Sequence, residues 1–560
     1  MEDAISAEES AYAGRWVALV RGKIIAQGET RDQVFQFARS SRSKEDVEIR
    51  YLSQMPVSSP LLDAVRILFS ADDPIYLVGG AVRDAVLGHT SHDLDFACQH
   101  GLKTAKKVAD GLSAAFFVLD EAYDTARVIL QNENGIRDVL DFAGFRGLSI
   151  DDDLHGRDFT INAVAMNIHT GEILDPLNGV KAIREKRISA CSDTALSMDP
   201  IRILRAVRQA AALGFSIESE TRKLMKNSSS LLSQVSPERL RDELFKILDG
   251  PRPDAAVRAL ELLDVFKNIL PELSAMKGVE QSAPHVHDVW AHTLAVLRHL
   301  SVILDALSPR YDEQKANADL MTGLLVLRLG RYRQQLGVHF DTSLNTNRSA
   351  RALLFFAALY HDVNKPQTKT VEENGRIRFL GHDEVGAKTA ENRGIALHLS
   401  NDENNRLCLI IQHHMRMHAM SSRKEAGHEI SKKSIYRFFR DTDESGVDLI
   451  LLALADKRAT YDHTLTQAHW AATLDVGREL LEAWFEKTDE IIRPQPLING
   501  NDLIEEFKLK PGPEIGKILE AVRENQVAGR VSTRSEALSF SSGWLEKAKD
   551  VERSARKIDR

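Results

Sequence analysis

The sequence predicts a multidomain protein in which α/β units come first and an almost entirely helical part follows. The chain has 560 residues, which is too long for a single hydrophobic core. Short β-like runs alternate with helical segments in residues 57–182, whereas apolar residues recur at three- and four-residue spacing after residue 183. We therefore expect a sheet-containing region followed by helical domains.

Composition excludes several classes of protein. The longest apolar runs fall far short of the roughly 20 residues that cross a bilayer, and the acidic residues 1–10 lack the basic and apolar regions of a signal peptide. Cys98, Cys191 and Cys408 form no CxxC pair, which argues against a disulfide framework and a cysteine zinc site. We expect a cytoplasmic protein with no membrane partner. Because the formal net charge is −8, any site for a polyanion has to be a local basic patch.

Residues 1–56 are predicted to form a small appended α/β module. Strand-like residues 16–20 and 23–26 flank Arg21-Gly22, which suggests a hairpin, and a helix at 31–40 precedes a strand at 47–52. No residue pattern in this module indicates a chemical function.

Four further domains follow from the change in periodicity along the chain. Residues 57–182 form the mixed-sheet head, residues 183–275 a helical neck, residues 276–490 a histidine-rich helical domain and residues 491–560 a helical tail. Ser236 and Pro237 mark a helix start in the neck, because serine caps helices and proline suits the first helical position. The strands expected in the head are residues 75–78, 94–97, 116–119, 126–131, 137–143 and 161–167.

Two short motifs in the head carry the first chemical signal. Gly79-Gly80 lies between a predicted strand and a predicted helix, where backbone N–H groups can approach a phosphate. Arg83 in the first helical turn is unfavourable for the helix dipole unless an anion is nearby. Asp93 and Asp95 lie two residues apart on a predicted strand and so share one face. Their carboxylates repel each other unless a cation such as Mg²⁺ lies between them.

Together these motifs resemble the class II tRNA nucleotidyltransferases and bacterial poly(A) polymerases. The segment GGAVRDAVLG…HDLDFA is similar to the GG-x-VRD-x-LLG…DxD signature of that family. The resemblance continues in family order, over residues 60–250, through DLHGRDFTINAVAMNI, DPLNG, MDPIRILRAVRQAAALGF and ERLRDELFKIL. It implies a nucleotidyltransferase-fold head that adds C and A nucleotides, from CTP and ATP, to the 3′ end of tRNA without a template.

The resemblance also implies roles for individual residues. Asp93 and Asp95 would be catalytic and hold two Mg²⁺ ions, and Asp141, whose match is looser, would supply a third catalytic carboxylate. Asp199 and Arg202 match the block that selects the incoming base, which fits the amine and ring nitrogen that cytosine and adenine both present. The implied nucleotide-binding residues are Gly79, Gly80, Arg83, Arg157, Asp158, Asn162, Asp199, Arg202, Arg205 and Arg208.

The sequence departs from the family pattern at three places. Met198 replaces a glutamate, and Gly156 replaces the first arginine of an RRD block. The segment between Asp141 and Arg157 is short, whereas CCA-adding members carry a longer flexible loop there that is thought to help the switch from C to A. Addition of CCA and addition of CC alone therefore both stay open. Poly(A) addition is a further alternative, because the catalytic blocks are shared.

The histidine-rich domain resembles the HD domain that is fused to many bacterial nucleotidyltransferases. The segments that carry the resemblance are HVHDVWAHTL, LYHDVNKP, GHDEVGA, QHHM and LADKRAT. The implied ligands of a divalent transition metal are His292, His361, Asp362 and Asp456, and His382 and His413 would extend the site to a second metal. Such domains hydrolyse phosphoesters. An alternative of another class is thus an HD phosphohydrolase whose N-terminal half only binds nucleotide or RNA. The tail resembles the C-terminal module of the same enzymes.

Overall fold

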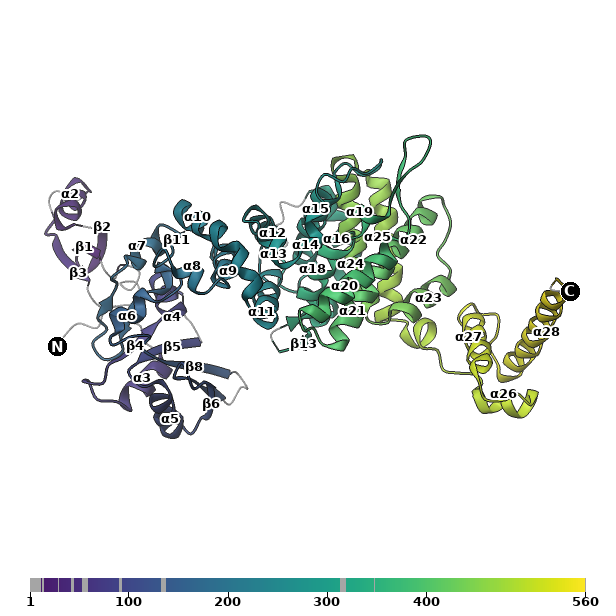
Figure 1. Cartoon of the computed structure of the whole chain (residues 1–560), viewed down its shortest axis with the longest axis horizontal. Coiled ribbons are helices and arrows are strands. Elements are labelled where there is room, and N and C mark those ends of the chain that lie inside the picture. Colours follow the sequence, from purple (N-terminus) through teal and green to yellow (C-terminus); the bar gives the residue numbers. More distant parts are fainter. Residues whose placement is uncertain are drawn as a thin grey trace. The chain divides into compact units, whose positions relative to one another are not determined.

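The computed structural model divides the chain into two compact units (Figure 1). One comprises Met1–Val235 with Leu263–Val265, and the other Ser236–Leu262 with Phe266–Arg560. The structure describes Tyr12 and residues 15–28, 30–41, 45–52, 59–89, 93–131, 137–312, 319–346 and 348–558, with only the backbone of residues 131, 137 and 548–558. Residues 1–10, for which we predict no signal peptide, lie outside this set. None of the helices in the described ranges is long and apolar enough to span a membrane.

The appended module is a three-stranded antiparallel sheet with one helix. Its elements are β1 (Arg15–Val20), β2 (Lys23–Gly28), α2 (Arg31–Ser41) and β3 (Glu48–Leu52), and the strand order is β2-β1-β3. The predicted hairpin is confirmed, since Arg21 and Gly22 both take positive φ angles of 52° and 75° in the turn between β1 and β2. Ala18 packs with Val34 and Ala38 of α2, so the helix covers one face of this sheet.

The head contains a mixed seven-stranded sheet, as the sequence predicts. The strand order is β10-β9-β4-β5-β8-β7-β6; β5 and β8 run parallel, and the other neighbours are antiparallel. The strands are β4 (Ile75–Val78), β5 (Asp93–Cys98), β6 (Ala115–Asp120), β7 (Thr125–Gln131), β8 (Arg137–Gly144), β9 (Ala165–Asn167) and β10 (Ile173–Leu174). The strand expected at residues 161–167 is correct only from Ala165. Thr160–Asn162 form a 3₁₀ turn, because the Asn162 side chain bonds back to Asp158.

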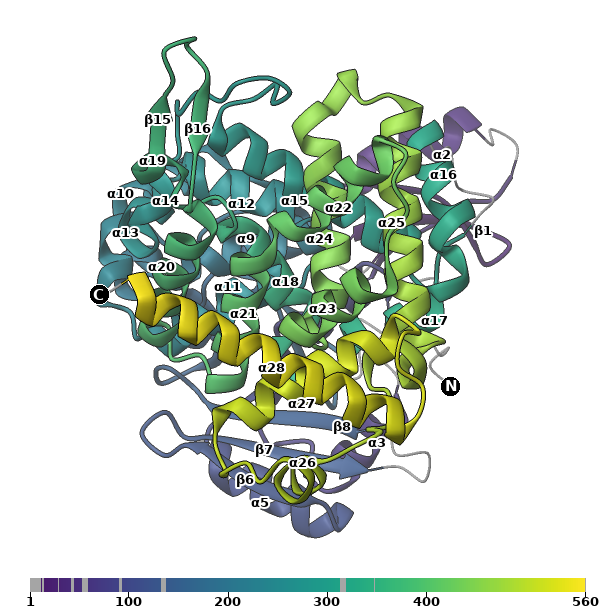
Figure 2. The ribbon, with the colours of Figure 1, turned by 90° about the vertical axis from the view of Figure 1, so that its right-hand side faces the viewer.

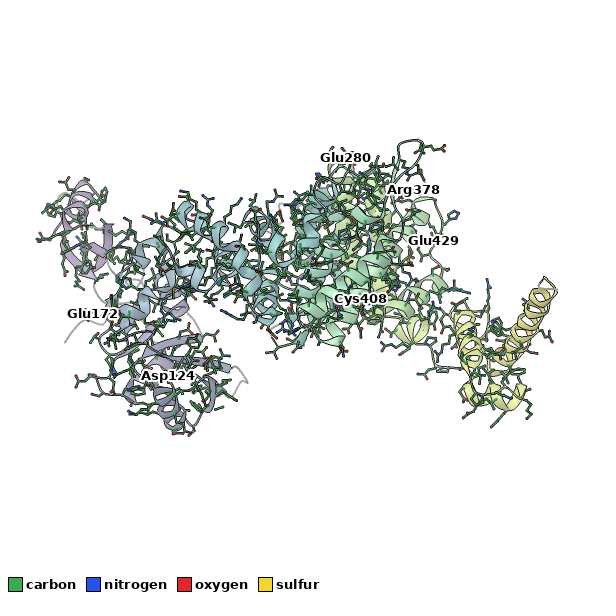
Figure 3. All side chains as sticks on the ribbon, viewed as in Figure 1. Asp124, Glu172, Glu280, Arg378, Cys408 and Glu429 are labelled. Carbon is green, nitrogen blue, oxygen red and sulfur yellow. The ribbon has the colours of Figure 1, made fainter. Side chains whose placement is uncertain are left out.

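Five helices accompany the sheet. They are α3 (Pro60–Ile67), α4 (Gly80–Val86), α5 (Gly101–Leu112), α6 (Ile150–His155) and α7 (Gly179–Arg184). Asp124, from the turn between β6 and β7, accepts hydrogen bonds from the backbone N–H groups of Gly101 and Leu102 and so caps α5 (Figure 3). Phe96 and Phe142 stack across β5 and β8 with ring centroids 4.7 Å apart. Since side chains alternate along a strand, the residues beside these phenylalanines emerge on the opposite face.

The neck is helical, as predicted. Its helices are α8 (Ala195–Met198), α9 (Arg202–Leu213), α10 (Ser219–Ser228), α11 (Pro237–Leu248), α12 (Pro253–Leu262), α13 (Val265–Ile269) and α14 (Pro271–Ser274). Ser236 caps α11 by accepting a hydrogen bond from the N–H of Arg239. Two short strands, β11 (Arg187–Ile188) and β12 (Ser216–Ile217), pair in parallel around α9, a detail that helical spacing does not reveal.

The histidine-rich domain is a helical bundle in which α24 is buried along most of its length. Its helices are α15 (Val289–Ala306), α16 (Leu320–Leu329), α17 (Arg333–Asp341), α18 (Ala350–Tyr360), α19 (Lys365–Thr368), α20 (His382–Ala396), α21 (Asn401–His413), α22 (Met415–Glu425), α23 (Lys432–Thr442), α24 (Ser445–Tyr461) and α25 (Gln467–Phe485). Two hairpins interrupt the helices: β13 (Ser343–Asn345) with β14 (Arg348–Ser349), and β15 (Lys369–Val371) with β16 (Ile377–Phe379). Figure 2 shows β15 and β16 side by side next to α19.

The tail is built from α26 (Gly500–Phe507), α27 (Pro513–Val527) and α28 (Arg534–Ile558) around its own apolar cluster. Glu524 of α27 joins the tail to α23. Its carboxylate accepts hydrogen bonds from Arg437 at 2.5 and 2.7 Å and lies 2.7 Å from Lys433 Nζ. The Arg437 hydrogen bond is the main cause that lowers the pKa of Glu524 to about 2.

We expect the Glu524→Gln variant to weaken this junction by about 2 kcal/mol, the usual value of a hydrogen bond to a charged group. Hydrogen exchange of α27 should be roughly 30-fold faster in the variant at pH 7. Because the folded-state pKa of Glu524 is depressed, its stabilisation is present above the unfolded pKa and is lost as the pH falls from about 4.5 to about 2. Glu514→Gln, at an exposed site of the same helix, is the control. Equal exchange rates in the two variants would show that Glu524 does not stabilise the contact between α27 and α23.

Candidate active site and metal centre

The glycine turn at Gly79 and Gly80 lies directly against Asp95, one of the predicted catalytic residues. Gly79 follows β4, has a φ of 70° and precedes α4. A Cβ atom at Gly79 would lie 3.1 Å from Asp95 Oδ2, so both the backbone conformation and the close approach favour glycine here. The N-terminus of α4 therefore opens beside a carboxylate, where a phosphate and its metal counterion would meet.

The predicted carboxylates come together on two central strands. Asp93 and Asp95 share one face of β5, and Asp95 lies opposite Asp141 on β8. Burial, and then repulsion from Asp141 and Asp93, raise the pKa of Asp95, although Arg157 and Arg127 oppose the shift. Crowded, partly buried carboxylate oxygens fit a hard divalent cation, because its charge would remove the repulsion.

Arg127 is a member of this group that the sequence does not predict. It lies directly opposite Asp141 on β7 and donates two hydrogen bonds to that carboxylate, from Nε and Nη2, each of 2.8 Å. A lone arginine within the apolar run TARVIL is the only sequence signal for it.

A cavity of about 440 Å³ joins the glycine turn to the neck helix α9. All ten predicted nucleotide-binding residues line it, together with Asp95, whereas Asp93 and Asp141 are outside the lining. The remaining lining residues are Arg146, Gln209, Ala212 and Leu213. The cavity thus brings together residues that span 79–213 of the sequence. Six arginines line it: five were predicted from the sequence, and the sixth, Arg146, was not.

Asn162 is the centre of the hydrogen bonds inside the cavity. Its Oδ1 accepts from Arg83 Nη1 at 3.0 Å, and its Nδ2 donates to Asp158 at 3.0 Å and to Gln209 Oε1 at 3.1 Å. Arg205 Nε donates to the second oxygen of Asp158 at 3.1 Å. Burial alone would raise the pKa of Asp158, but Arg205, Asn162 and the Phe159 N–H hold it below its usual value. The buried carboxylate is therefore held ionised.

Main-chain atoms hold Arg202 of the predicted base-selecting pair. Arg202 donates hydrogen bonds to the backbone carbonyls of Gly156, Arg157 and Ala195, and its Nε lies 3.9 Å from Asp199. Arg157 is held in turn by Asp153, through two hydrogen bonds of 3.0 and 2.8 Å that sequence reasoning did not predict. The guanidinium of Arg202 is thus positioned beside Asp199 by main-chain atoms.

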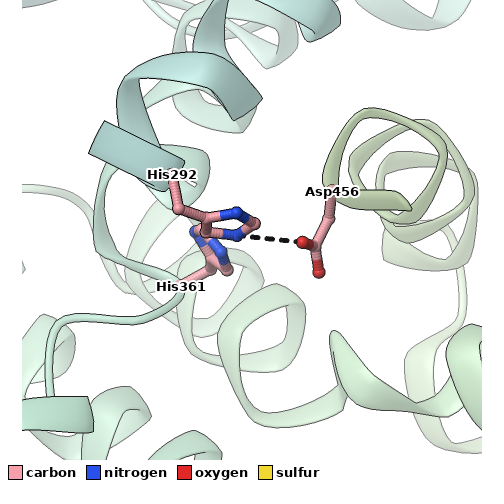
Figure 4. A group of neighbouring side chains, drawn as sticks. All are labelled: His292, His361 and Asp456. Carbon is pink, nitrogen blue, oxygen red and sulfur yellow. Dashed lines mark ion pairs between the residues drawn. The ribbon is translucent and has the colours of Figure 1, made fainter. Parts of the chain in front are cut away.

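The histidine-rich domain gathers six side chains from five helices or helix ends. One triad consists of His292, His361 and Asp456 (Figure 4), with His292 Nε2 3.0 Å from Asp456 Oδ1. The other consists of Asp362, His382 and His414, and in each triad the ligand atoms lie within 4.8 Å of one another. Asp362 connects the two, since its Oδ2 is 3.1 Å from His361 Nε2 and its Oδ1 is 3.4 Å from His382 Nε2.

His414, and not the predicted His413, completes the second triad. The two residues are adjacent at the end of α21, so their side chains leave the helix in different directions. His414 is buried against His382, with their Nε2 atoms 3.2 Å apart, whereas His413 is only partly buried.

The ring orientations fit a pair of divalent transition metals. Nδ1 of His361, His382 and His414 bonds to the backbone carbonyl three residues earlier, which turns each Nε2 toward Asp362. His361 Nε2 and both Asp362 oxygens lack a well-aligned hydrogen bond among the described residues. Burial, and then repulsion from His361 and His382, lower the pKa of His414 to about 3, which favours the neutral imidazole that binds metals.

A second cavity, of about 470 Å³, opens onto these triads. Asp362, His382, His414 and Asp456 line it together with His285 and His418. Its cationic lining residues are Lys365, Arg376, Arg378 and Lys457. Arg376 and Arg378 come from the β15–β16 hairpin, and Figure 3 labels Arg378. Metal ligands beside cations suit a phosphoester. Arg376 and Arg378 lie outside the segments that carry the HD resemblance, so the sequence gives no signal for them.

Comparison with known proteins identifies the domains in which the two sites lie. The "Poly A polymerase head domain" model matches residues 75–189, an RNA-binding model of polymerase A matches 214–277, the HD domain matches 289–461, and a second-domain model of tRNA nucleotidyltransferases matches 463–540. A CC-adding tRNA nucleotidyltransferase of Thermus thermophilus is 29% identical over 475 residues, which cover 83% of this chain and 93% of that protein. An A-adding tRNA nucleotidyltransferase of Deinococcus radiodurans is 29% identical, with coverage of 84% and 95%.

The chain is a nucleotidyltransferase with an HD domain, and its domains are those of tRNA nucleotidyltransferases.

The fold agrees with that of a solved CCA-adding enzyme. The Thermotoga maritima CCA-adding enzyme in complex with tRNA superimposes with a TM-score of 0.54 and 20% identity, and the match covers 87% of this chain and 96% of that one. As a nucleotidyltransferase with an HD domain, the chain depends on divalent metal ions, for which the carboxylates of the head and the two triads are the candidate ligands.

The three departures from the family pattern now have structural positions. The Met198 side chain is 80% exposed, so the residue in place of the usual glutamate does not enter the cavity lining. The carbonyl of Gly156 anchors Arg202. The short segment before Arg157 folds into helix α6, which begins with a capping box between Ser149 and Asp152.

Proposed function

We propose that the protein adds C, or C and A, nucleotides to the 3′ end of tRNA without a template and with Mg²⁺ in the head. The observation that carries the proposal is the single cavity that unites the glycine turn, Asp95 and the Asp199–Arg202 pair. Relatives that are named CC-adding and A-adding tRNA nucleotidyltransferases, and the structure of a relative with tRNA, support the choice of substrate.

The triphosphate of CTP or ATP would lie at the glycine turn. The N-terminal N–H groups of α4 and the Arg83 guanidinium offer donors there, and Asn162 and Asp84 hold that guanidinium in place. Arg157, locked by Asp153, adds a second fixed positive charge. Fixed donors avoid reorganisation when charge develops on the leaving pyrophosphate.

The carboxylates of the head would hold the metals. Bound Mg²⁺ supplies activation of the 3′-hydroxyl and neutralisation of the pyrophosphate. Asp93 and Asp95 provide oxygens on one face of β5, and Asp141 stands beside Asp95 as the third carboxylate of the proposed set. Arg127 keeps Asp141 oriented by its two hydrogen bonds.

Base choice would rest on Asp199 and Arg202. Asp199 can accept from the exocyclic amine of cytosine or adenine, and Arg202 can donate to the adjacent ring nitrogen. Uracil and guanine present a carbonyl where the amine should be, and the carboxylate rejects it.

Replacing Asp199 by alanine should relax this choice. We expect the preference of the Asp199→Ala variant for CTP over UTP, measured as a ratio of kcat/KM values, to fall at least tenfold, since one discriminating hydrogen bond and one repulsive contact are lost. The control is Asp193→Ala, an exposed site in the preceding loop. An unchanged ratio in Asp199→Ala would remove this residue from base selection.

We further propose that C addition is the main reaction. Residues 145–156, all of them described, form a compact segment around α6, and Arg146 lies 3.8 Å from the buried Asp153. No long loop stands between β8 and Arg157 in this fully described stretch. This compactness, and the CC-adding relative, support a site that is built for one base type.

The two triads support a second function, hydrolysis of phosphoesters in the HD domain. His292, His361 and Asp456 would hold one metal, and Asp362, His382 and His414 the other. The lysines and arginines of the adjoining cavity would bind the phosphate. This function is independent of nucleotidyl transfer.

We also propose domain boundaries at residues 56, 182, 275 and 490. A cytoplasmic location remains a prediction.

A further inference from the structure

Gln209 is a buried polar residue to which the mechanism so far gives no role. It lies on α9, is 7% exposed and lines the head cavity. Arg202 and Arg205 precede it by seven and four residues, so the three side chains lie on one face of the helix. A buried amide in a ligand cavity needs partners for both its oxygen and its nitrogen.

The orientation of this amide follows from the chemistry of its neighbours. Arg83 can only donate hydrogen bonds, so it must face the oxygen of Asn162, at 3.0 Å. The ionised Asp158 can only accept, so it must face the nitrogen of Asn162, at 3.0 Å. The second hydrogen of that nitrogen points at Gln209 over 3.1 Å, and only the oxygen of Gln209 can receive it.

The nitrogen of Gln209 is therefore the end that remains for a ligand. It has no hydrogen-bond partner in the described part of the chain, and the residue borders the cavity. Two N–H groups with no protein partner, on a side chain that is more than nine-tenths buried, indicate a bound acceptor.

The position of Gln209, between the residues proposed to bind the base and the triphosphate, indicates which part of the nucleotide accepts its hydrogen bond. Arg202, at the proposed base end, lies about 10 Å away along the helix axis. Arg83, at the proposed triphosphate end, is separated from Gln209 only by Asn162. The ribose joins base to triphosphate, and a neutral amide suits a hydroxyl, whereas the phosphates are faced by arginines.

We propose that Gln209 Nε2 donates a hydrogen bond to a ribose hydroxyl oxygen of the incoming nucleotide and so selects ribonucleotides. The inference rests on the proposed nucleotidyl transfer and adds a sugar-reading residue to it. Gln209 would touch the substrate directly, while its oxygen also fixes Asn162 and hence Arg83.

The test compares CTP with 2′-deoxy-CTP and 3′-deoxy-CTP on a tRNA transcript that ends before the first C. We expect Gln209→Leu to lower the preference for CTP over the analogue that lacks the contacted hydroxyl, measured as a ratio of kcat/KM values, about tenfold, the effect of one lost hydrogen bond. The lost bond to Asn162 lowers the values for CTP and for the analogue alike, so it cancels in this ratio.

A second variant separates contact from positioning. Gln209→Glu keeps an oxygen for Asn162 but has no N–H donor, so a ribose hydroxyl can bind it only by donating its own hydrogen. An analogue with fluorine in place of the contacted hydroxyl cannot donate, so the preference for CTP over this analogue should be larger in Gln209→Glu than in the wild type. If CTP and all the analogues lose the same factor in the two variants, or if neither variant changes any value, Gln209 reads no sugar and the inference is overturned. A wild-type protein that transfers no nucleotide at all overturns the proposed function as well, and that result is distinct from the first two.

Discussion

The Asp95→Asn variant should lose nucleotide transfer by about 1,000-fold or more while its fold is retained. Asp95 is the carboxylate on which the glycine turn, Asp93 and Asp141 converge, and a neutral amide binds Mg²⁺ poorly. Losing the metal that neutralises the phosphates raises the activation free energy by several kcal/mol. A rise of about 4 kcal/mol slows transfer about 1,000-fold. Single-turnover incorporation of labelled CTP into tRNA measures it.

In the absence of metal, Asp95→Asn should be more stable than the wild type at high pH. Because burial and the neighbouring carboxylates raise the folded-state pKa of Asp95, the wild type is stabilised below the unfolded pKa and loses that contribution as the pH rises. Asn does not titrate, so the melting temperature of Asp95→Asn in EDTA should exceed that of the wild type more at pH 8 than at pH 4.

Asp110→Asn is the matched control for both measurements. Asp110 is an exposed residue of α5 that pairs with Lys106 at 2.9 Å, remote from the cavity lining. We expect its transfer rate to stay within about twofold of the wild type, as is usual for surface substitutions. Transfer by Asp95→Asn at the rate of this control would remove Asp95 from the catalytic site.

The second large effect concerns the HD domain. Asp362→Asn should abolish binding of both transition metals, because the Asp362 carboxylate contacts both triads. Its oxygens lie 3.1 Å from Nε2 of His361 in one triad, and 3.4 and 3.9 Å from Nε2 of His382 and His414 in its own. His414→Ala should lose only one of the two metals. Metal analysis of protein dialysed against Mn²⁺ or Ni²⁺ gives the stoichiometry, and a chromogenic phosphomonoester reports hydrolysis.

Transfer of CTP by the head should stay unchanged in both HD variants, since the head cavity has its own carboxylates. His428→Ala, at an exposed histidine of the same unit, should keep full metal content. Full metal content in Asp362→Asn would contradict the site. If the metal-loaded wild type hydrolyses no phosphoester, the metal site stands but the proposed hydrolysis is contradicted.

The residues that the sequence predicts well are close together along the chain or follow one periodicity. Gly79, Gly80 and Arg83 form a single strand–turn–helix, and the period of two places Asp93 and Asp95 on one face whatever surrounds them. The row from Asp199 to Arg208 is likewise a local helical pattern. The fold class follows from the same alternation, since periodicity separates the sheet from the helices.

The residues that were missed depend on register and on packing between distant segments. Arg127 meets Asp141 only because β7 and β8 pair in one register out of several. Gln209 meets Asn162 across 47 positions, and Asp153 locks Arg157 only through the fold of α6. The choice between His413 and His414 depends on where α21 ends, and helix boundaries are the least predictable feature of a sequence.

The most direct test supplies tRNA transcripts that end before the first C, after one C and after CC, each with labelled CTP, ATP, UTP or GTP. We expect CTP to be incorporated on the first two transcripts, and UTP and GTP to be used on none. Incorporation of a single A on the third transcript would extend the reaction to CCA. No incorporation on any transcript, or long tails of A without use of CTP, would contradict the proposed function.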